Sequence, residues 1–242
     1  GEKVAIVSDK PQTTRTKITG ILTVDKTQFV FLDTPGLHKP KTKLSDYMNK
    51  QVSDSVADVD VAVLVTEATG EIRKAETDLI ENFKKLHIPT ILVLNKTDIL
   101  VNKEDLLLKI ASMTQLMEFD HVIPVSAHTG ENTDVLMEKL GEYACEGPHF
   151  FPDDSMTDQP ERVIVAEIIR EKLLKYLSQE IPHGTAVVVE SMKQRADKDI
   201  TDIHATIFCE RQSHKGMVIG KGGALLKKIA SESRQEAEEF LG

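Results

Sequence analysis

The stretch PTILVLNKTD, residues 89–98, joins a short apolar run to four polar residues. Apolar, β-branched runs of this length, bounded by polar residues, are typical of strands buried on both faces of a parallel sheet. Two similar runs occur elsewhere in the first half of the chain, DVAVLVTE at 60–67 and HVIPVS at 121–126. The pattern therefore predicts a sheet of buried parallel strands, each followed by polar residues.

Amphipathic stretches with helical spacing lie between and beside these runs, at 43–57, 74–86, 103–117 and 132–144. Near the start, KVAIVS at 3–8 has the composition of a strand, and ITGILTVD with QFVFLD at 18–33 reads as a hairpin. Strands that alternate with helices of this length predict a three-layer α/β sheet with right-handed crossovers.

The pattern changes at CEGPHFFPDDSMTDQP, residues 145–160, which contains three prolines and four acidic residues. We interpret 148–160 as a linker. Beyond it the expected order is a helix at 162–180, strands at 185–193 and 202–211, a short helix, a glycine-rich turn and a long helix at 224–242. This order predicts a separate small α+β domain.

The composition is that of a soluble globular protein, with 242 residues, 40% hydrophobic and 29% charged. The net charge is −9, which argues against wholesale coating of DNA, yet Arg211 to Lys228 holds five basic residues and no acidic one. Two cysteines and eight histidines show no metal-ligand spacing. No secretory leader pattern opens the sequence, so we expect a cytoplasmic protein.

Polar motifs follow three of the expected strands, and ligands of open α/β sheets bind at the carboxyl ends of strands. The first motif is Asp33-Thr34-Pro35-Gly36. The Asp33 carboxylate can hold Mg²⁺ through a water molecule, and the Gly36 N–H can approach a terminal phosphate because no Cβ intervenes.

The second and third motifs fit a guanine base. Asp98 can accept the two N–H groups on the edge of guanine, Asn95 can tie the base to neighbouring loops, and the Lys96 stem can cover the ring. In the third motif a backbone N–H near Ser126 and Ala127 can meet guanine O6. Each motif alone could be a strand-ending turn or a helix cap. Their order on successive strand ends favours a nucleotide site.

The second domain contains HKGMVIGKGGALLKKI, residues 214–229, in which GKGG lies between two helical stretches. This is the G-x-x-G pattern of KH domains, where small residues let the nucleic-acid backbone approach. The alternative is an ordinary helix–helix turn with surface lysines. The local positive charge favours binding of single-stranded RNA, with these candidate contact residues: Lys215, Gly220, Lys221, Gly222, Gly223, Lys227 and Lys228.

The chain resembles the ribosome-assembly GTPases that carry a C-terminal KH domain. The resemblance rests on SDKPQTTR at 8–15, DTPGLHKPKTKLSDYMNKQV at 33–52, NKTD, PVSAHTGEN at 124–132, and above all on the junction at 149–174. It covers nearly the whole sequence. It implies a P-loop GTPase domain at 1–147, a linker at 148–160, and a type II KH domain at 161–242.

The resemblance also implies function. It implies GTP hydrolysis with Mg²⁺, and coupling of the GTP or GDP state to binding of the 3′ region of small-subunit ribosomal RNA on the 30S subunit. Thr13 or Thr14 would lie in the first switch and reach Mg²⁺ or the terminal phosphate, and we favour Thr14. Residues 37–50 would form the second switch. We expect a monomer, and the sequence leaves open a peripheral contact with the inner face of the cell membrane.

Two features depart from the family pattern. Leu37 follows DTPG where Ras-like relatives place a water-orienting glutamine. The water must then be positioned by backbone groups, another residue or K⁺, so we assign no catalytic side chain and expect low intrinsic turnover. In addition, no G-x-x-x-x-G-K-[ST] occurs in the sequence. We therefore expect that the chain lacks its first strand and its phosphate loop, and binds GTP poorly as given. The KH order stops after its long helix, so we expect that its last strand is missing as well.

Three functional hypotheses remain. The leading one is a GTPase switch whose nucleotide state controls RNA binding. The second is an RNA-binding module whose α/β domain is a nucleotide-incompetent scaffold. The third is a relative of the tandem GTPases of ribosome assembly, which also end in a KH-like domain, although the intact GKGG loop disfavours it.

Overall fold

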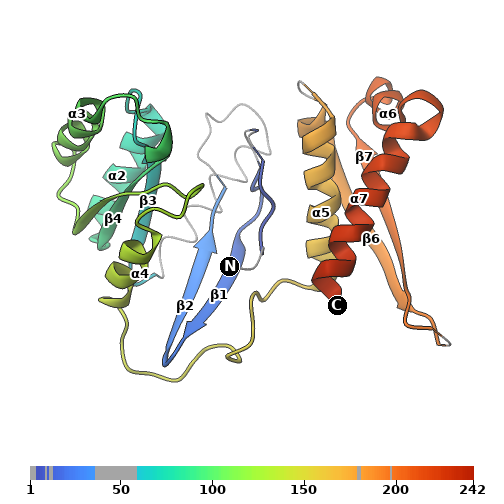
Figure 1. Cartoon of the computed structure of the whole chain (residues 1–242), viewed down its shortest axis with the longest axis horizontal. Coiled ribbons are helices and arrows are strands. Elements are labelled where there is room, and N and C mark those ends of the chain that lie inside the picture. The colour runs from blue at the N-terminus through green and yellow to red at the C-terminus, as the bar shows by residue number, and fades with distance from the viewer. Residues whose placement is uncertain (1–3, 9, 11–12, 36–58, 179–180, 197) are drawn as a thin grey trace. The chain divides into compact units, whose positions relative to one another are not determined.

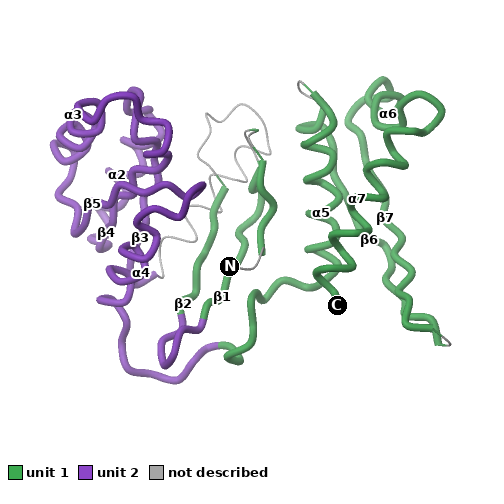
Figure 2. Tube along the Cα trace, in the orientation of Figure 1, with its two compact units in different colours: residues 1–22, 29–36, 151–242 green, residues 23–28, 37–150 purple. Residues whose placement is uncertain are grey.

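The computed structural model describes residues 4–8, 10, 13–35, 59–178, 181–196 and 198–242 (Figure 1). The chain separates into two units (Figure 2). Unit 1 comprises Gly1–Leu22, Phe29–Gly36 and Phe151–Gly242, and unit 2 comprises Thr23–Gln28 and Leu37–Phe150. The domain boundaries expected from the sequence remain a prediction.

Unit 2 is built on a three-stranded parallel sheet in the order β3-β4-β5. The strands are β3 (Ala62–Glu67), β4 (Thr90–Asn95) and β5 (His121–Pro124), and the helices are α2 (Lys74–Leu86), α3 (Lys103–Thr114) and α4 (Thr133–Gly141), with the short η1 (Thr97–Ile99) after β4. The three predicted strands and α2 are confirmed, while α3, α4 and β5 are shorter than expected.

The central strand β4 forms the middle of the hydrophobic core. Five of its six residues are buried, and Ile91, Leu92 and Leu94 have no exposed surface. Ile80 and Phe83 of α2 complete this core from the side of that helix. Because the strand is buried on both faces, its polar end at Asn95 is the first place where solvent and ligands can meet it.

A hairpin of β1 (Ile18–Val24) and β2 (Thr27–Asp33) forms a two-stranded sheet of its own; most of its two strands belongs to unit 1, and its turn, within Thr23–Gln28, belongs to unit 2. The connection is two residues long, and Asp25 adopts a positive φ of 53° there, as two-residue hairpin turns require.

The segment around residues 156–157 runs beside β1. The Ile21 N–H donates to the Met156 carbonyl at 2.8 Å, and the Thr157 hydroxyl donates to the Thr19 carbonyl at 2.6 Å.

The rest of unit 1 has the predicted α+β order. Its elements are α5 (Glu161–Tyr176), η2 (Pro182–Gly184), β6 (Thr185–Gln194), β7 (Thr201–Cys209), α6 (Gln212–Ile219), η3 (Lys221–Gly223) and α7 (Ala224–Leu241). The antiparallel pair β6–β7 has a register shift between Val189 and Ser191. The main core of this part joins Leu173 and Leu177 of the α5 region to Val218 of α6 and Ile229 of α7.

Two expectations were wrong in detail. Residues 4–8 form no strand; instead the Val7 N–H donates to the Glu171 carboxylate of α5 at 3.3 Å, so a side chain takes the place of a strand partner. Helix α5 ends at Tyr176 rather than at 180. The predicted helix at 43–57 lies outside the described residues.

Among the helices that the structure describes, none combines the length and apolar character needed to cross a membrane.

Replacing Leu92 with alanine should destabilise unit 2 strongly. Leu92 is 0% exposed at the centre of β4, so Leu92→Ala should lower the free energy of unfolding by about 2–5 kcal/mol in a urea titration. The matched control is Leu107→Ala on α3, where the side chain is 63% exposed and the change should stay within about 0.5 kcal/mol. Equal effects of the two substitutions would contradict the assigned core.

Candidate functional site

The end of β4 is held to the loop after β5 by Asn95. Its side-chain oxygen accepts the Lys96 N–H at 2.8 Å and the Ala127 N–H at 3.0 Å. Lys96 lies in the left-handed region, with φ 68° and ψ 39°, which turns the chain sharply at this point. Asn95 therefore joins the end of β4 to the loop after β5, and its role at a bound base stays a prediction.

Asp98 is held by the next strand end. The Ser126 hydroxyl donates to Asp98 Oδ1 at 2.7 Å, and this hydrogen bond is the main cause that lowers the pKa of the Asp98 carboxyl. A lowered pKa keeps the side chain ionised, and an ionised carboxylate is the acceptor that the two N–H groups of guanine require. The structure thus brings together Asn95, Asp98, Ser126 and Ala127 in unit 2.

A short closed loop supports Ser126. The Ser126 N–H donates to the Glu131 carbonyl at 3.1 Å, and the Gly130 N–H donates to the Ser126 carbonyl at 2.8 Å. The Ala127 N–H is already donated to Asn95. The expected contact between an amide of this loop and guanine O6 therefore stays a prediction.

Sequence reasoning missed the partner of Lys96. The Lys96 ammonium lies 2.7 Å from Glu67 Oε1, and this hydrogen bond lowers the pKa of Glu67. Glu67 is the last residue of β3 and stands opposite Asn95 in the parallel register. Glu67 ends one predicted strand and Lys96 directly follows the next. Aligning these two parallel strands in register could therefore have predicted the pair.

In unit 1 the structure places Thr14, rather than Thr13, beside Asp33. The Thr14 hydroxyl donates to Asp33 Oδ2 at 3.1 Å, whereas the Thr13 hydroxyl donates to the Lys10 carbonyl at 2.6 Å. Although Asp33 is exposed, desolvation by the surrounding residues raises the pKa of its carboxyl, and hydrogen bonds from Thr14 and the Thr34 backbone oppose this effect. Gly36 lies outside the described residues.

The donor set of this pair fits Mg²⁺. A hydroxyl and a carboxylate are hard oxygen ligands, and Mg²⁺ in nucleotide sites is usually held by one or two protein oxygens together with phosphates and waters. Within the described ranges no group of three or more His, Cys, Asp or Glu side chains could hold a metal on its own. The pair therefore suits a metal that arrives with a nucleotide.

The GKGG loop joins α6 to α7 in a conformation that needs glycine. Gly220 has φ 72°, and a Cβ there would lie 2.6 Å from Leu225 Cβ. Gly222 and Gly223 also have positive φ, of 56° and 79°, but a Cβ on either would meet nothing within 4 Å. The first glycine therefore serves packing, while the later two leave open space in front of the loop.

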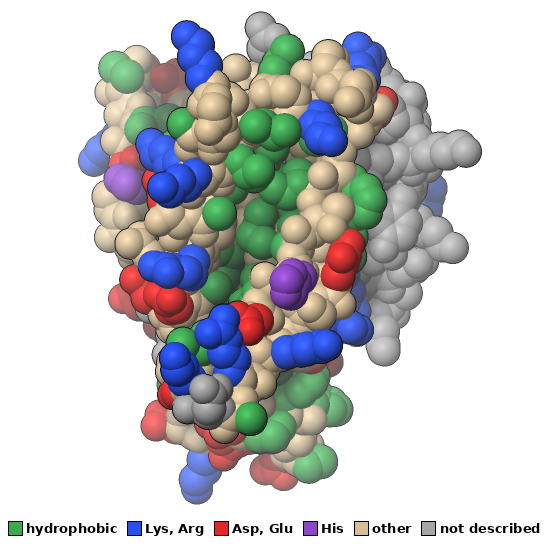
Figure 3. Space-filling model, turned by 90° about the vertical axis from the view of Figure 1, so that its right-hand side faces the viewer, with side chains coloured by type: hydrophobic (Ala, Val, Ile, Leu, Met, Phe, Trp, Pro, Cys, Tyr) green, Lys and Arg blue, Asp and Glu red, His purple; other side chains and the backbone are tan. Residues whose placement is uncertain are grey.

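The candidate lysines divide into two groups. Lys215, Lys221, Lys227 and Lys228 are all exposed, and Lys228 differs in that its Nζ lies 4.3 Å from the centre of the Tyr176 ring of α5. On the side of the molecule that Figure 3 shows, the surface is hollowed and lined by hydrophobic side chains, and Lys, Arg, His and acidic side chains lie around it (Figure 3). An apolar floor with lysines and arginines nearby suits a strand of bases and phosphates.

Comparisons with known families and proteins identify relatives for both parts of the chain. Residues 1–96 match the family described as 50S ribosome-binding GTPase, and residues 180–242 match the KH domain family. The chain is similar to GTPase Era of Clostridioides difficile strain 630, with 48% identity over all 242 residues and 82% of that protein. It is equally similar to GTPase Era of Alkaliphilus metalliredigens strain QYMF, with the same identity and shares of both chains.

Two solved structures have the same fold over 99% of this chain and 82% of theirs, each with a TM-score of 0.94 and 34% sequence identity. One is Era in complex with MgGDPNP and nucleotides 1506–1542 of 16S ribosomal RNA. The other is Aquifex aeolicus Era bound to GDP and AlF₄⁻.

Replacing Asp98 with asparagine should change the nucleotide preference from GTP towards XTP. The amide presents a donor where guanine also presents donors, while xanthine offers a carbonyl in place of the amino group. Affinity for GTP should fall by roughly tenfold or more, since hydrogen bonds to a charged group contribute about 1.5–3 kcal/mol. Competition titrations with both nucleotides measure this. Asp105→Asn on α3, an exposed site, is the control, and unchanged GTP preference of Asp98→Asn would refute the base site.

Replacing Asp33 with asparagine should separate folding from metal binding. Because the pKa of Asp33 is raised in the folded state, its protonation favours folding, and the parent loses this stability as the pH rises through that pKa. Without Mg²⁺ and nucleotide, Asp33→Asn should thus gain stability relative to the parent as the pH rises from about 4 to 7. Its nucleotide affinity should no longer respond to Mg²⁺.

Thermal unfolding over this pH range and nucleotide titrations with and without Mg²⁺ measure the two effects of Asp33→Asn. The control is Asp25→Asn at the hairpin turn, an exposed position on the same hairpin. A full Mg²⁺ response in Asp33→Asn would show that this carboxylate does not hold the metal.

Proposed function

Because the chain belongs to the Era family of GTPases, we propose that it is a GTP-hydrolysing switch that binds the 3′ region of small-subunit ribosomal RNA through its KH domain during assembly of the 30S subunit. The observation that supports this proposal most is that one chain, which resembles Era over all of its own 242 residues, contains both the Asp98–Ser126 arrangement suited to a guanine base and a G-x-x-G loop. That full-length resemblance favours Era over the tandem-GTPase alternative.

The base half of the proposed nucleotide site is in unit 2. Asp98 accepts the guanine N–H groups, Asn95 holds the two loops together, and the Lys96 stem lies against the ring while its ammonium pairs with Glu67. The phosphate half includes Thr14 and Asp33 of unit 1, whose oxygens would hold Mg²⁺. When bound, Mg²⁺ neutralises charge on the phosphates and orients them. The Gly36 amide is the proposed partner of the terminal phosphate.

The hydrolysis step has no assigned side-chain base. Leu37 cannot hydrogen-bond a water molecule, so we propose that the attacking water is positioned by backbone groups, by another residue or by K⁺. This arrangement gives slow intrinsic turnover, and an activating partner would accelerate it.

The RNA half of the proposal uses the loop and helices of the KH domain. Gly222 and Gly223 leave space for the sugar-phosphate backbone, and the exposed Lys215, Lys221 and Lys227 supply the positive charge. Lys228 is a weaker candidate, because it lies over Tyr176. The relative that was solved with 16S ribosomal RNA supports small-subunit RNA as the partner class.

We further propose a monomer that acts in the cytoplasm, where small-subunit RNA is assembled. Peripheral contact with the inner face of the cell membrane is a second location that the same protein could adopt. Gel filtration and fractionation of cell extracts address these two points. The scaffold alternative predicts RNA binding that ignores nucleotide and an intact protein that binds no GTP.

Replacing Gly222 with aspartate should abolish RNA binding through charge alone. Gly222 has φ 56° and no atom within 4 Å of an added Cβ, and Asp and Asn both tolerate this left-handed conformation. Gly222→Asp should therefore fold, but its carboxylate would repel the phosphates and weaken binding by at least roughly tenfold. Gly222→Asn has the same shape without charge and should bind nearly as the parent does.

Binding of an oligonucleotide with the small-subunit 3′ sequence, measured by fluorescence anisotropy, compares the two Gly222 variants. GTP affinity should be equal in both and in the parent. Retained RNA binding by Gly222→Asp would contradict the loop assignment.

A further inference from the structure

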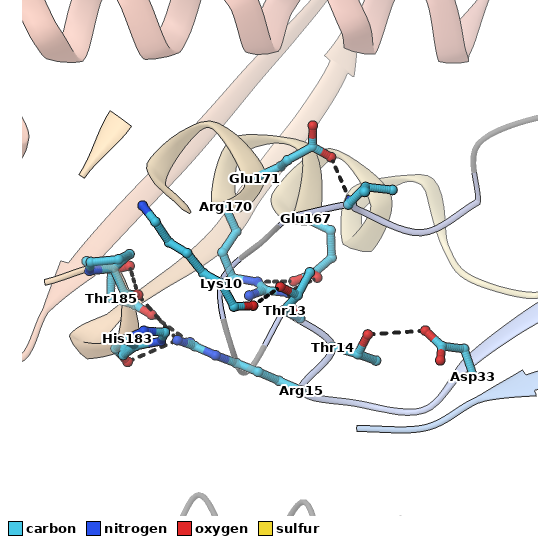
Figure 4. Close-up of polar contacts among 12 residues, drawn as sticks. Lys10, Thr13, Thr14, Arg15, Asp33, Glu167, Arg170, Glu171, His183 and Thr185 are labelled. Atoms are coloured by element: carbon cyan, nitrogen blue, oxygen red, sulfur yellow. Dashed lines mark hydrogen bonds and ion pairs between the residues drawn. The ribbon is translucent and has the colours of Figure 1, made fainter. Parts of the chain in front are cut away.

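The segment that carries Thr14 is tied to the KH part of unit 1 by polar contacts (Figure 4). The Lys10 ammonium donates to the carbonyls of Leu174 and Leu177 at the end of α5, and Arg170 of α5 donates to the Thr13 carbonyl. Lysine at a helix C-terminus satisfies carbonyls that have no partner within the helix. These contacts fix the path of the chain on both sides of residues 11–12.

Arg15 makes the most extensive contact. One of its terminal nitrogens donates to the Thr185 carbonyl at 2.7 Å, and the other donates to the carbonyls of His183 and Pro182 at 2.9 and 3.3 Å (Figure 4). All three acceptors belong to the η2 turn and the first residue of β6. The planar guanidinium has donors in a fixed fork, so a single arginine can hold a whole turn in one orientation.

The same turn is joined to the base of α6 on its other side. The Glu210 N–H donates to the Gly184 carbonyl at 2.8 Å. A Cβ at Gly184 would lie 3.3 Å from Glu210 Cβ, so the two segments are in close contact. Helix α6 starts two residues later, at Gln212, and ends at the GKGG loop. A shift of the η2 turn would therefore also move the start of α6, the helix that ends at the GKGG loop.

Arg15 lies near a second cation. Arg170, which is 3% exposed, donates to the Thr13 carbonyl, and its Nε donates to Glu167 at 2.8 Å. In the part of the chain that the structure describes, Arg15 Nε and Arg170 Nη1 are buried without a hydrogen-bond partner. The contact between Arg15 and the η2 turn is thus made with main-chain carbonyls, while Arg170 places a like charge nearby.

Thr14 and Arg15 are consecutive, so a displacement of one restricts the positions open to the other. Their Cα atoms are about 3.8 Å apart across one planar peptide. Thr14 faces Asp33 and Arg15 faces the η2 turn. A hydroxyl and a carboxylate at 3.1 Å are placed to share one cation, and a nucleotide that brings this cation would hold Thr14 and, with it, the backbone of Arg15 more firmly than their hydrogen bond alone.

We propose that Arg15 is a positioning residue that transmits the nucleotide state to the RNA-binding loop. When the triphosphate state holds Thr14 at Asp33, Arg15 holds the η2 turn, and the turn holds the base of α6. When the terminal phosphate is lost, Arg15 releases the turn. This inference rests on the proposed function, because it requires a GTP-dependent RNA affinity.

The experiment compares RNA affinity of the intact protein with Mg²⁺ and a non-hydrolysable GTP analogue against GDP. The ratio of the two affinities in the parent should fall in the range typical of allosteric coupling, roughly 5–150-fold. In Arg15→Ala it should fall to within about twofold of one, with GTP-analogue affinity unchanged. Arg162→Ala, an exposed arginine on α5, is the matched control and should keep the parent ratio.

Retention of the parent ratio by Arg15→Ala would overturn the inference. If Arg15→Ala does not fold, Arg15→Lys decides in its place: the ammonium cannot hold three carbonyls as a fork does, so the ratio should again fall, and an unchanged ratio would overturn the inference. A parent without any nucleotide effect would contradict the proposed function itself.

A second measurement tests the Arg15 contact without nucleotide or RNA. Amide hydrogen exchange at Thr185 and Glu210, whose N–H groups bond within and onto the η2 turn, should be faster in Arg15→Ala than in the parent and in Arg162→Ala. Equal exchange rates in all three proteins would show that Arg15 does not hold the turn. This outcome is independent of whether the proposed function holds.

Discussion

Two neighbouring residues, Thr14 and Arg15, must satisfy partners in different parts of the chain at the same time. Thr14 donates to Asp33 at the end of β2, and Arg15 donates to three carbonyls at the start of the KH strands. One rigid peptide joins them. Any ligand that acts on the first residue therefore acts on the second, and this constraint gives the fold a physical route from phosphate to RNA.

Electrostatics differs between the two groups of candidate residues. In unit 2, a hydrogen bond from Ser126 lowers the pKa of Asp98, so this carboxylate, the acceptor that we propose for guanine, stays ionised. In unit 1, desolvation raises the pKa of Asp33, while hydrogen bonds from Thr14 and the Thr34 backbone oppose this effect. A cation bound at Asp33 would favour its ionised form.

The sequence was most informative where local pattern and tertiary environment coincide. The buried run at 90–95 and the amphipathic stretch at 74–86 became β4 and α2 at the predicted positions. The polar motifs at the ends of β4 and β5 could be linked in advance, because parallel strands bring their carboxyl ends to one edge. Asn95 and Ser126 are the examples.

The sequence was least informative where backbone groups of distant segments meet. Residues 4–8 have the composition of a strand, yet their backbone bonds to Glu171, which lies more than 160 residues away. Arg15 belongs to a motif that predicts phosphate chemistry at Thr14, but its own partners are main-chain carbonyls, which leave no side-chain signature. The lysines of the second domain also looked alike in the sequence, and only the structure shows that Lys228 lies over the Tyr176 ring.

The most direct test of the central claim is a pair of crystal structures of the intact protein, one with Mg²⁺ and a non-hydrolysable GTP analogue and one with GDP. The quantity to read is the distance from the Arg15 guanidinium to the carbonyl oxygens of Pro182, His183 and Thr185. The account predicts hydrogen-bond distances, about 2.7–3.2 Å, with the GTP analogue and loss of these contacts with GDP. The same three contacts in both structures would contradict it.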